Sequence, residues 1–299
     1  VADYNRVVQW GPPGHQQREP VGEMFDRICL PRQAFPEVFS HCRERGMEPF
    51  VTVFDPADVD FVLNLGQRLF KISSGDVNYK SLLAAVSGTG MPVLISGGKC
   101  TFGELVRAVE VLERGGGELC VMHCVAAYPA PVDEANLMVL RGYAAQFPEA
   151  VLGFSDHTQG LTCALGAIAL GAMVVEKHVT YDREAVGPDH WFSATGSEFA
   201  DLVNQCRSLY KALGSSRKTI LACEETGAKF GRRSIVAVRD LPAGHQIRAD
   251  DLTYLRPGTG IDPFDENIVI GAVCRRAIKK NTLLTLAKFD FADDDGLAK

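Results

Sequence analysis

The sequence predicts an α/β protein, a parallel (β/α)8 TIM barrel followed by a small β-domain. Between about residues 48 and 213, short apolar runs rich in Val, Ile and Phe alternate with segments of helical periodicity. Such alternation is typical of parallel βα units joined by right-handed crossovers. After about Lys211 the pattern changes to short strands with turn signals, which predicts a second domain of a different class.

Six strands are predicted in the first region, and their near-continuous apolar character suits a sheet covered on both faces. They span residues 49–54, 69–72, 92–96, 119–124, 151–154 and 173–176. Between two of them, Thr101 and Glu104 form a capping box that opens a helix. Ser197 is expected to open another helix after the last strand.

Polar residues gather at the ends of these strands, which favours a barrel over a Rossmann-like sheet. In a barrel, the loops after the strands build the active site at one face. A Rossmann-like sheet concentrates its signal in one Gly-rich turn, and the chain contains no G-x-G-x-x-G run. Residues 1–48 offer one helix, at about 33–45, and no strand pair, with 11–20 interpreted as a loop. Two of the eight strands are therefore expected to be absent from this chain.

The C-terminal region is predicted to be a small β-domain without helical periodicity. Residues 214–230 have the pattern of a linker, and strands are expected at 232–238, 271–278 and 283–286. We place the N-terminally incomplete barrel at 1–213, the β-domain at 231–288 and a disordered acidic tail at 289–299.

Composition argues against several classes of protein. With 31 basic and 37 acidic residues the net charge is −6, which disfavours nucleic-acid binding through a basic face. No apolar run reaches the roughly 18 residues of a membrane span, and the first thirty residues lack the apolar core of a signal peptide. The nine cysteines include no C-x-x-C pair, so we expect all nine to be buried thiols of a cytoplasmic protein.

Two histidines are candidates for a metal site. His157 and His178 each follow a strand, and the two strands are consecutive in the sequence. Neighbouring strands lie about 4.8 Å apart, so both imidazoles can share one cation and leave positions open for substrate. Asp156 and Glu176 are expected to orient the imidazoles by hydrogen bonding. The alternative is that these histidines only cap the core.

A cation and several hydroxyls at the strand ends predict a cradle for phosphate or carboxylate. The cation is Lys71, and the hydroxyls belong to Thr52, Ser74, Ser96 and Ser155. Taken singly, each serine also suits a turn or a helix N-cap. Arg256 precedes a Pro-Gly turn and on pattern alone is a surface arginine, while His190 lies in a long loop that suits a lid.

Several runs together resemble the sialic acid synthase family, which condenses phosphoenolpyruvate with aminosugars to make nonulosonic acids. In the first region they are FKISSGD (70–76), VLISGGK (93–99), VMHCVAAYPAP (121–131), GFSDHTQG (153–160), GAMVVEKHVT (171–180) and GPDH (187–190). RRS (232–234) and YLRPGTGI (254–261) match the family's antifreeze-like, or SAF, domain of β-clip fold. The resemblance covers about residues 30–288.

The resemblance implies a role for each matching position. His157 and His178 are the implied ligands of a divalent cation, typically Mn²⁺ with Mg²⁺ or Co²⁺ as alternatives, and Lys71 joins them in catalysis. Phosphoenolpyruvate is expected at Thr52, Lys71, Ser74, Ser96 and Ser155. The N-acylated sugar is expected at Asp76, Tyr128 and Asp189, and Phe54 is also assigned to substrate binding. Phe230 and Arg256 match a pair lent to the neighbouring subunit's site, which implies a domain-swapped homodimer.

The implied reaction is a transferase reaction that joins phosphoenolpyruvate to an aminosugar such as N-acetylmannosamine and releases phosphate by C–O cleavage. Two departures matter. Val125 and Ala126 replace polar residues of other members, which leaves the choice of sugar open. The family's Glu and Lys-Phe-Gln motifs of the first two strands are missing, and residues 1–30 resemble the loop after the second strand, so we expect a segment of the natural protein to be absent.

Three alternatives remain at this point. The chain could be a synthase of another nonulosonic acid, legionaminic or pseudaminic acid. It could be a non-catalytic sugar- or partner-binding relative that kept the pockets. A phosphoenolpyruvate aldolase-type barrel acting on a sugar phosphate is the third, and the SAF-like region argues against it.

Overall fold

The computed structural model describes residues 3–291, and the chain divides after Gly214 into two compact units. Each unit is described by itself. The predicted tail at 292–299 lies outside the described residues.

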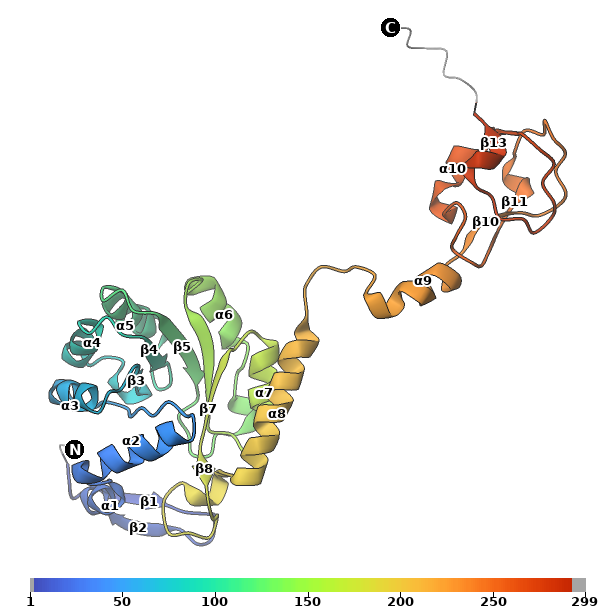
Figure 1. Cartoon of the computed structure of the whole chain (residues 1–299). Helices are drawn as coiled ribbons and strands as arrows, with labels where there is room; N and C mark the ends of the chain where they lie inside the picture. The colour runs from blue at the N-terminus through green and yellow to red at the C-terminus, as the bar shows by residue number, and fades with distance from the viewer. Residues whose placement is uncertain (1–2, 292–299) are drawn as a thin grey trace. The chain divides into compact units, whose positions relative to one another are not determined.

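A curled parallel sheet of five strands forms the centre of the first unit, in the order β3-β4-β5-β6-β7 (Figure 1). The strands are β3 (Phe70–Ile72), β4 (Val93–Ser96), β5 (Leu119–Cys124), β6 (Val151–Asp156) and β7 (Val174–Lys177). The helices are α1 (Val21–Ile28), α2 (Phe35–Glu44), α3 (Val59–Asn64), α4 (Lys80–Ser87), α5 (Phe102–Glu113), α6 (Val139–Gln146), α7 (Thr162–Ala169) and α8 (Gly196–Leu213). A short pair, β8 (Val179–Thr180) and β9 (Ala194–Thr195), follows the sheet.

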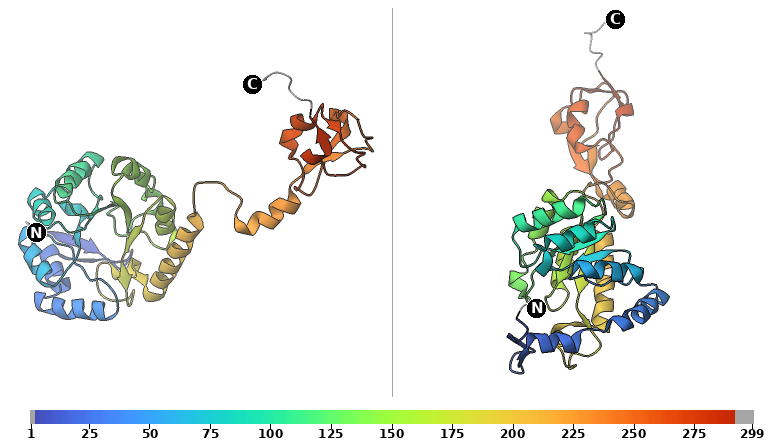
Figure 2. Two further views of the ribbon diagram at one scale, coloured as in Figure 1. Left: turned by 45° about the horizontal axis from the view of Figure 1, so that its top comes forward. Right: turned by 90° about the vertical axis from the view of Figure 1, so that its left-hand side faces the viewer.

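Helices lie around the sheet (Figure 2), and apolar residues of the strands and of these helices make one core. Phe70, Ile72, Ile95 and Val121 are fully buried, and Phe154 is 2% exposed. Burial on this scale stabilises the unit by roughly 2–3 kcal/mol for each large side chain. The predicted α/β class with a parallel sheet is thereby confirmed.

Five strands form in the described part of the sheet, rather than the predicted six. At 49–54 only Thr52 pairs with the sheet, in an isolated parallel bridge to Lys71. The reason is the side chain of Gln67, which accepts a hydrogen bond from Val51 N at 2.9 Å and donates one to Val51 O at 3.2 Å. These bonds occupy the backbone groups that a strand would use.

The N-terminal segment holds a β-hairpin, so the prediction of no strand pair before residue 48 and of a loop at 11–20 is wrong. β1 (Val7–Trp10) pairs antiparallel with β2 (Gln17–Pro20). Gly11 and Gly14 in the connection adopt φ of +103° and +83°, which residues with a Cβ rarely adopt. Hairpins of this kind have a weak apolar signal, because both faces of β2 are largely polar.

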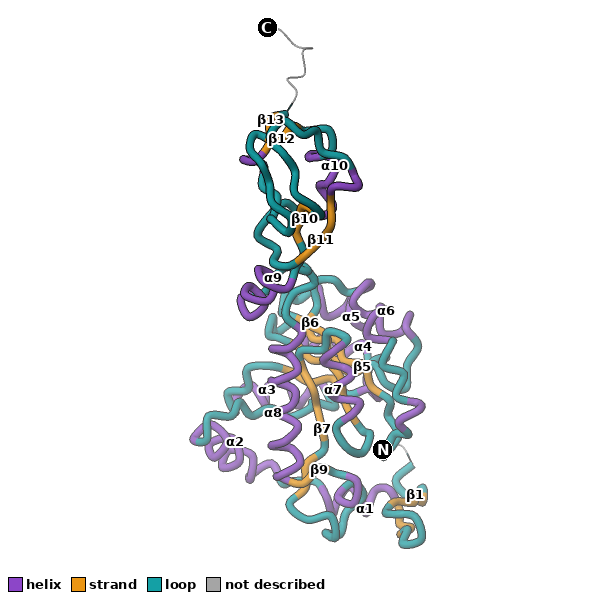
Figure 3. Tube along the Cα trace, turned by 90° about the vertical axis from the view of Figure 1, so that its right-hand side faces the viewer, coloured by secondary structure: helices purple, strands orange, loops and turns teal. Residues whose placement is uncertain are grey.

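Two helices begin with a capping box, and one of the two N-cap residues differs from the prediction. Thr101 caps α5 and makes the predicted capping box with Glu104. The last helix of the first unit, α8, is capped by Thr195 with Glu198, not by Ser197 as predicted. It packs against α7 at the end of the unit (Figure 3).

The second unit is a small β-domain with short helices. Its strands are β10 (Ser234–Ala237), β11 (Leu252–Leu255), β12 (Val273–Cys274) and β13 (Phe289–Asp290), and its helices are α9 (Glu225–Gly231) and α10 (Glu266–Val269). Helix α9 occupies the end of the predicted linker, and no strand forms at 283–286, where Leu283 only bridges to Val236. Phe289 is fully buried in β13, so the domain continues past the predicted limit of 288.

A buried carboxylate in this unit predicts a pH-dependent stability. Asp251 is fully buried, and it accepts hydrogen bonds from His245 Nε2 at 2.7 Å and from the backbone N of Arg248 and Nε of Arg239 at 2.9 Å. Burial by itself raises the pKa of Asp251, but the three donors outweigh it and hold the pKa at about 2, below the ordinary 3.8.

The stabilisation from Asp251 is therefore complete above about pH 4 and is lost as the pH falls toward 2. We expect Asp251→Asn to lower the unfolding free energy of this unit by about 2 kcal/mol at pH 7 and to remove the acid-dependent loss. Amide hydrogen exchange in β10 of the whole chain measures both. The same pH dependence in variant and wild type would refute this role of Asp251.

The cysteines differ from the expectation that all nine are buried. Cys29 and Cys223 are exposed and three others are half-buried, so only Cys120, Cys124, Cys163 and Cys274 are buried thiols. All nine are free. Separately, a helix with the length and apolar character of a membrane span does not occur in residues 3–291.

Candidate functional site

The carboxyl ends of the parallel strands bring most of the predicted residues to one rim of the sheet. Lys71 lies in β3, Ser96 ends β4, and Ser155 lies in β6. Each of these strands is paired in register with its neighbour: Lys71 of β3 pairs with Leu94 of β4, and Ser155 of β6 pairs with Glu176 of β7. Because all five strands run the same way, the loops that follow them meet at this rim.

Two imidazoles face each other at this rim. His157 directly follows β6 and His178 directly follows β7, and the two ring centroids lie 5.2 Å apart. His157 Nδ1 lies 3.0 Å from the carbonyl oxygen of Val125, which accepts the proton of that nitrogen. That bond leaves Nε2 of His157 as the unprotonated nitrogen, the form that binds a metal.

The donor set fits a divalent cation with open positions. Burial lowers the pKa of His157, and the neighbouring His178 lowers it further, so the neutral ring predominates near pH 7. Within residues 3–291 no group of three or more His, Cys, Asp or Glu side chains is arranged to hold a metal. The two imidazoles are therefore the candidate protein donors, and substrate or water oxygens can occupy the remaining positions.

Tyr128 and Asp189 border the histidine pair. The Tyr128 ring lies 4.3 Å from that of His157 and 5.8 Å from that of His178, measured between centroids. Partial desolvation raises the pKa of Tyr128 to about 12, so the phenol keeps its proton at neutral pH. Asp189 Oδ2 lies 3.6 Å from His178 Nδ1. Two of the three predicted sugar-facing residues, Tyr128 and Asp189, therefore adjoin the candidate metal ligands.

Lys71 is the buried cation of the predicted cradle. Only 4% of the residue is exposed, its Nζ donates to Ile72 O at 3.2 Å, and Glu176 Oε2 lies 3.6 Å away. Ser155 Oγ donates to the other oxygen of Glu176 at 2.8 Å. A cation at the bottom of the rim with a single carboxylate opposite attracts an anionic ligand.

The remaining hydroxyls lie on neighbouring elements. Ser74 Oγ accepts a hydrogen bond from Gly98 N at 3.0 Å, which joins the loops after β3 and β4. Ser96 is 2% exposed, and its Oγ donates to the sulfur of Met122 at 4.0 Å. Thr52 is half-buried beside Lys71 through their bridge.

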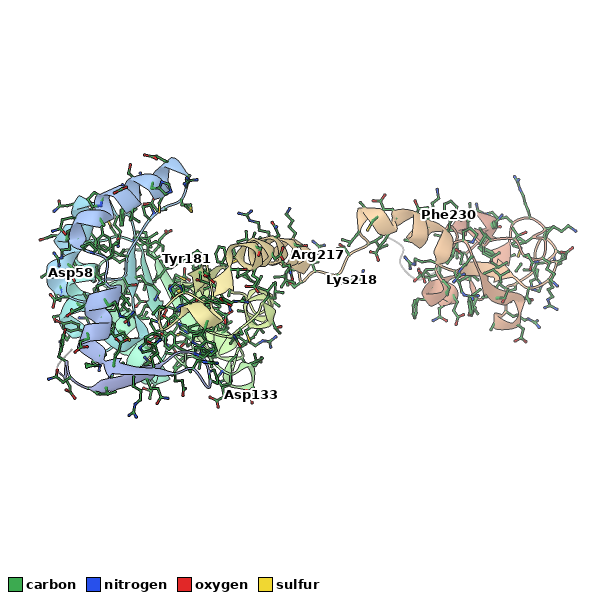
Figure 4. The ribbon with its side chains drawn as sticks, turned by 90° about the horizontal axis from the view of Figure 1, so that it is seen from below. Asp58, Asp133, Tyr181, Arg217, Lys218 and Phe230 are labelled. Carbon is green, nitrogen blue, oxygen red and sulfur yellow. The ribbon has the colours of Figure 1, made fainter. Side chains whose placement is uncertain are left out.

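Four predicted substrate-binding residues remain, two of them in each unit. The Phe54 side chain is 60% exposed. Asp76 lies in the turn after Ser74 and accepts a hydrogen bond from Ser73. Phe230 and Arg256 belong to the second unit, where Phe230 projects from α9 (Figure 4) and Arg256 Nε donates to Gly231 O at 2.7 Å.

The hydrogen bonds expected from Asp156 and Glu176 to the histidines do not form. Asp156 Oδ2 instead lies 2.8 Å from Lys177 Nζ, and Asp156 Oδ1 accepts from Thr158 N and Oγ1. The two side chains of this ion pair are 0% and 3% exposed, so it is sealed beneath the rim. Lys177 was not predicted, although it precedes His178 as Asp156 precedes His157 and pairs with Asp156 in the strand register.

A cavity of about 650 Å³ opens beside His178. His178, Asp189 and His190 line one wall and Arg27 of α1 lines another. His190 is anchored, since its Nδ1 lies 2.8 Å from Thr180 Oγ1. The volume is ample for a ligand of monosaccharide size.

Residues 3–218 match the NeuB family and residues 232–290 match the SAF domain. The chain belongs to the NeuB family. This confirms the resemblance noted in the sequence.

Similar proteins are named acid synthases, and this NeuB family member is an enzyme of the same kind. It is 32% identical to the N,N'-diacetyllegionaminic acid synthase of Campylobacter jejuni over 88% of this chain and 79% of that one. It is 31% identical to the N-acetylneuraminate-9-phosphate synthase of Mus musculus over 80% of this chain and 67% of that one. The sialic acid synthetase structure from Leptospira borgpetersenii, 28% identical, aligns with a TM-score of 0.67 over 69% of this chain and 72% of that one.

Proposed function

We propose that this NeuB family enzyme condenses phosphoenolpyruvate with an N-acylated aminosugar to a nonulosonic acid and releases phosphate. The observation that carries the proposal is the shared rim, where a buried lysine lies in the same sheet as two facing imidazoles. The lysine suits the anionic phosphoenolpyruvate, and the imidazole pair suits a metal-bound carbonyl group. The names of the similar synthases support the same class of product.

The bonds that form and break follow from the two substrates. The C3 carbon of phosphoenolpyruvate bonds the aldehyde carbon of the open-chain sugar, water adds to C2, and the C2–O bond to phosphate breaks. A divalent cation on His157 and His178, which we propose to be Mn²⁺, would supply Lewis acidity at the aldehyde oxygen when bound.

The chain's own side chains hold and orient the reactants in this proposal. Lys71 and the hydroxyls of Thr52, Ser74, Ser96 and Ser155 hold the phosphate and carboxylate, whose charge persists through the reaction, so they position more than they accelerate. Tyr128 and Asp189 hold the sugar beside the histidines. Phe54 and Asp76 remain substrate-binding candidates from the resemblance alone.

A phosphate-release assay tests the proposal. The enzyme is given phosphoenolpyruvate, Mn²⁺ and either N-acetylmannosamine or another sugar from a panel of mono- and di-N-acyl hexoses. It should release one phosphate for each nonulosonic acid formed. No phosphate above background with any sugar would contradict the proposal and favour the non-catalytic relative. The panel also separates neuraminic from legionaminic or pseudaminic acid synthesis.

We further propose a cytoplasmic, domain-swapped homodimer in which Phe230 and Arg256 complete the neighbouring subunit's site. Phe230 is 57% exposed, which leaves its ring available to a partner. Arg256 uses Nε for Gly231 O, so its terminal nitrogens are available to donate to a ligand.

Arg256→Ala should then raise the KM for the sugar by roughly tenfold or more, because a hydrogen bond from a charged donor is lost. The KM for phosphoenolpyruvate should change less than about twofold. Initial rates with each substrate varied in turn measure both constants, with the exposed Arg276→Ala of the same unit as control. An equal rise in both constants, or none, would rule out the sugar-binding role.

A further inference from the structure

Lys99 lies in the loop after β4 and has an uncommon backbone conformation. Its φ is +55°, a left-handed value that residues with a Cβ rarely adopt. The backbone before it is anchored twice. Gly97 N donates to Met122 O at 2.9 Å, and Gly98 N donates to Ser74 Oγ at 3.0 Å. A side chain that is held on such a backbone is a candidate for a functional role.

Gly98 brings this loop against the phosphate cradle. A methyl group in place of its α-hydrogen would lie 2.8 Å from Ser74 Oγ and 3.2 Å from the Cβ of Ala126, closer than ordinary contacts. Only a glycine therefore allows the loop to approach both the turn after β3 and the loop after β5 so closely. Lys99 is the next residue, so its side chain leaves the backbone at this junction.

The ammonium group of Lys99 lies beside the ring that adjoins the histidine pair. Its Nζ lies 5.8 Å from the centroid of the Tyr128 ring, within the roughly 6 Å of a cation–π contact. The same Tyr128 ring lies 4.3 Å from the ring of His157. This contact keeps a flexible, exposed side chain at the rim instead of leaving it extended into water.

Without Lys99, the predicted cradle has too little positive charge for its ligand. Phosphoenolpyruvate carries about three negative charges near neutral pH, about two of them on its phosphate. Lys71 contributes one positive charge, but Glu176 Oε2 lies 3.6 Å from its Nζ and offsets that charge. The hydroxyls of the cradle add no charge. Lys99, in contrast, forms no ion pair within residues 3–291, so its charge is available to a ligand.

We propose that Lys99 is the second cation of the cradle and binds the phosphate of phosphoenolpyruvate. Ser74, a proposed phosphoenolpyruvate contact, is bonded to the loop that carries Lys99, so both can reach one phosphate group. Lys71, which is 4% exposed, then serves the carboxylate deeper in the site. This inference rests on the proposed function, because the anion is taken to be the phosphoenolpyruvate of that reaction.

Calorimetric titration with phosphoenolpyruvate in the absence of sugar measures binding without turnover. Lys99→Met keeps the apolar stem and removes the charge, so it should raise the Kd for phosphoenolpyruvate roughly tenfold or more. Lys99→Gly, which suits the φ of +55°, should show the same loss with a relaxed loop. Lys99→Arg keeps the charge and should stay within about threefold of the wild type.

Lys211→Met is the matched control, because Lys211 is an exposed lysine of α8, away from the strand ends. This variant should bind phosphoenolpyruvate as the wild type does. Raising the KCl concentration from about 0.05 M to about 0.5 M should weaken binding to the wild type more than to Lys99→Met, since salt screens an exposed charge. Equal Kd values for Lys99→Met and the wild type would overturn the proposal.

Initial rates separate a phosphate contact from a role in supporting Tyr128. Lys99→Met should raise the KM for phosphoenolpyruvate about tenfold and change the KM for the sugar less than about twofold. A rise confined to the KM for the sugar would overturn the proposal, because Lys99 would then act through the Tyr128 ring. Binding of phosphoenolpyruvate that depends on Lys99, without phosphate release on addition of any sugar, would support this inference and contradict the condensation.

Discussion

Replacing His178 with alanine should abolish metal-dependent turnover, with a loss in kcat/KM on the order of a thousandfold. His178 is half-exposed at the rim, and its ring faces His157 with the centroids 5.2 Å apart. With one imidazole gone, a single protein donor remains among the described His, Cys and carboxylate groups placed for the ion. A Lewis acid contributes several kcal/mol to such a reaction, and this contribution disappears when the ion is not held.

Manganese binding provides a readout that does not depend on catalysis. The electron paramagnetic resonance signal of free Mn²⁺ disappears on binding, and we expect the affinity of His178→Ala and His157→Ala to fall by at least about 100-fold. His41→Ala, which removes an exposed histidine from α2, is the matched control and should bind Mn²⁺ as the wild type does. Unchanged binding in both site variants would end the assignment of this pair as metal ligands.

The rim could be predicted from the sequence because parallel strands impose it. Once the apolar runs around Lys71, Ser96 and Ser155 are assigned to consecutive strands, the side chains at their ends must meet at one edge. The facing of His157 and His178 follows from the same argument, since β6 and β7 are hydrogen-bonded neighbours. Short, near-continuous apolar runs indicate strands of this kind, because both of their faces are buried.

Contacts made by single long side chains could not be predicted in this way. The edge segment at 49–54 looks like a strand, yet the amide of Gln67, sixteen residues after Val51, takes its backbone hydrogen bonds. The N-terminal hairpin, in contrast, forms strands where the sequence does not indicate them, because β2 is polar and its pairing depends on turn glycines. No periodicity signals either case.

The hydrogen-bond partners that orient the histidines could not be predicted from the sequence either. Acidic neighbours in the sequence suggested carboxylate partners, but His157 uses the backbone carbonyl of Val125, 32 residues away. Adjacent residues of a strand point to opposite faces, so Asp156 is directed away from the side that His157 occupies. Its carboxylate meets Lys177 instead.

Lys177→Met should strongly destabilise the first unit, lowering its unfolding free energy by roughly 3–5 kcal/mol. Lys177 Nζ lies 2.8 Å from Asp156 Oδ2 and also donates to the carbonyl of Thr158. The methionine keeps the apolar stem but leaves Oδ2 of a fully buried carboxylate without a partner. Such a loss is a large fraction of the 5–15 kcal/mol typical of a domain.

Urea denaturation followed by tryptophan fluorescence measures this change, since both tryptophans belong to the first unit. The double variant Asp156→Asn with Lys177→Met should recover a substantial part of the loss, because no unpaired charge then remains buried. Arg68→Met, which breaks an exposed pair with Glu48, should leave the free energy nearly unchanged. A loss in Lys177→Met no larger than in this control would contradict the role of the pair.

The same ion pair also links stability to the site. It ties the end of β6 to the end of β7 one residue before each histidine, so the spacing of the imidazoles depends on it. We therefore expect Lys177→Met, under conditions where it remains folded, to bind Mn²⁺ more weakly by about 10- to 100-fold. The double variant should recover stability without recovering this affinity, because a neutral amide opposite methionine no longer clamps the two strand ends. If affinity returned together with stability, the pair would serve folding alone.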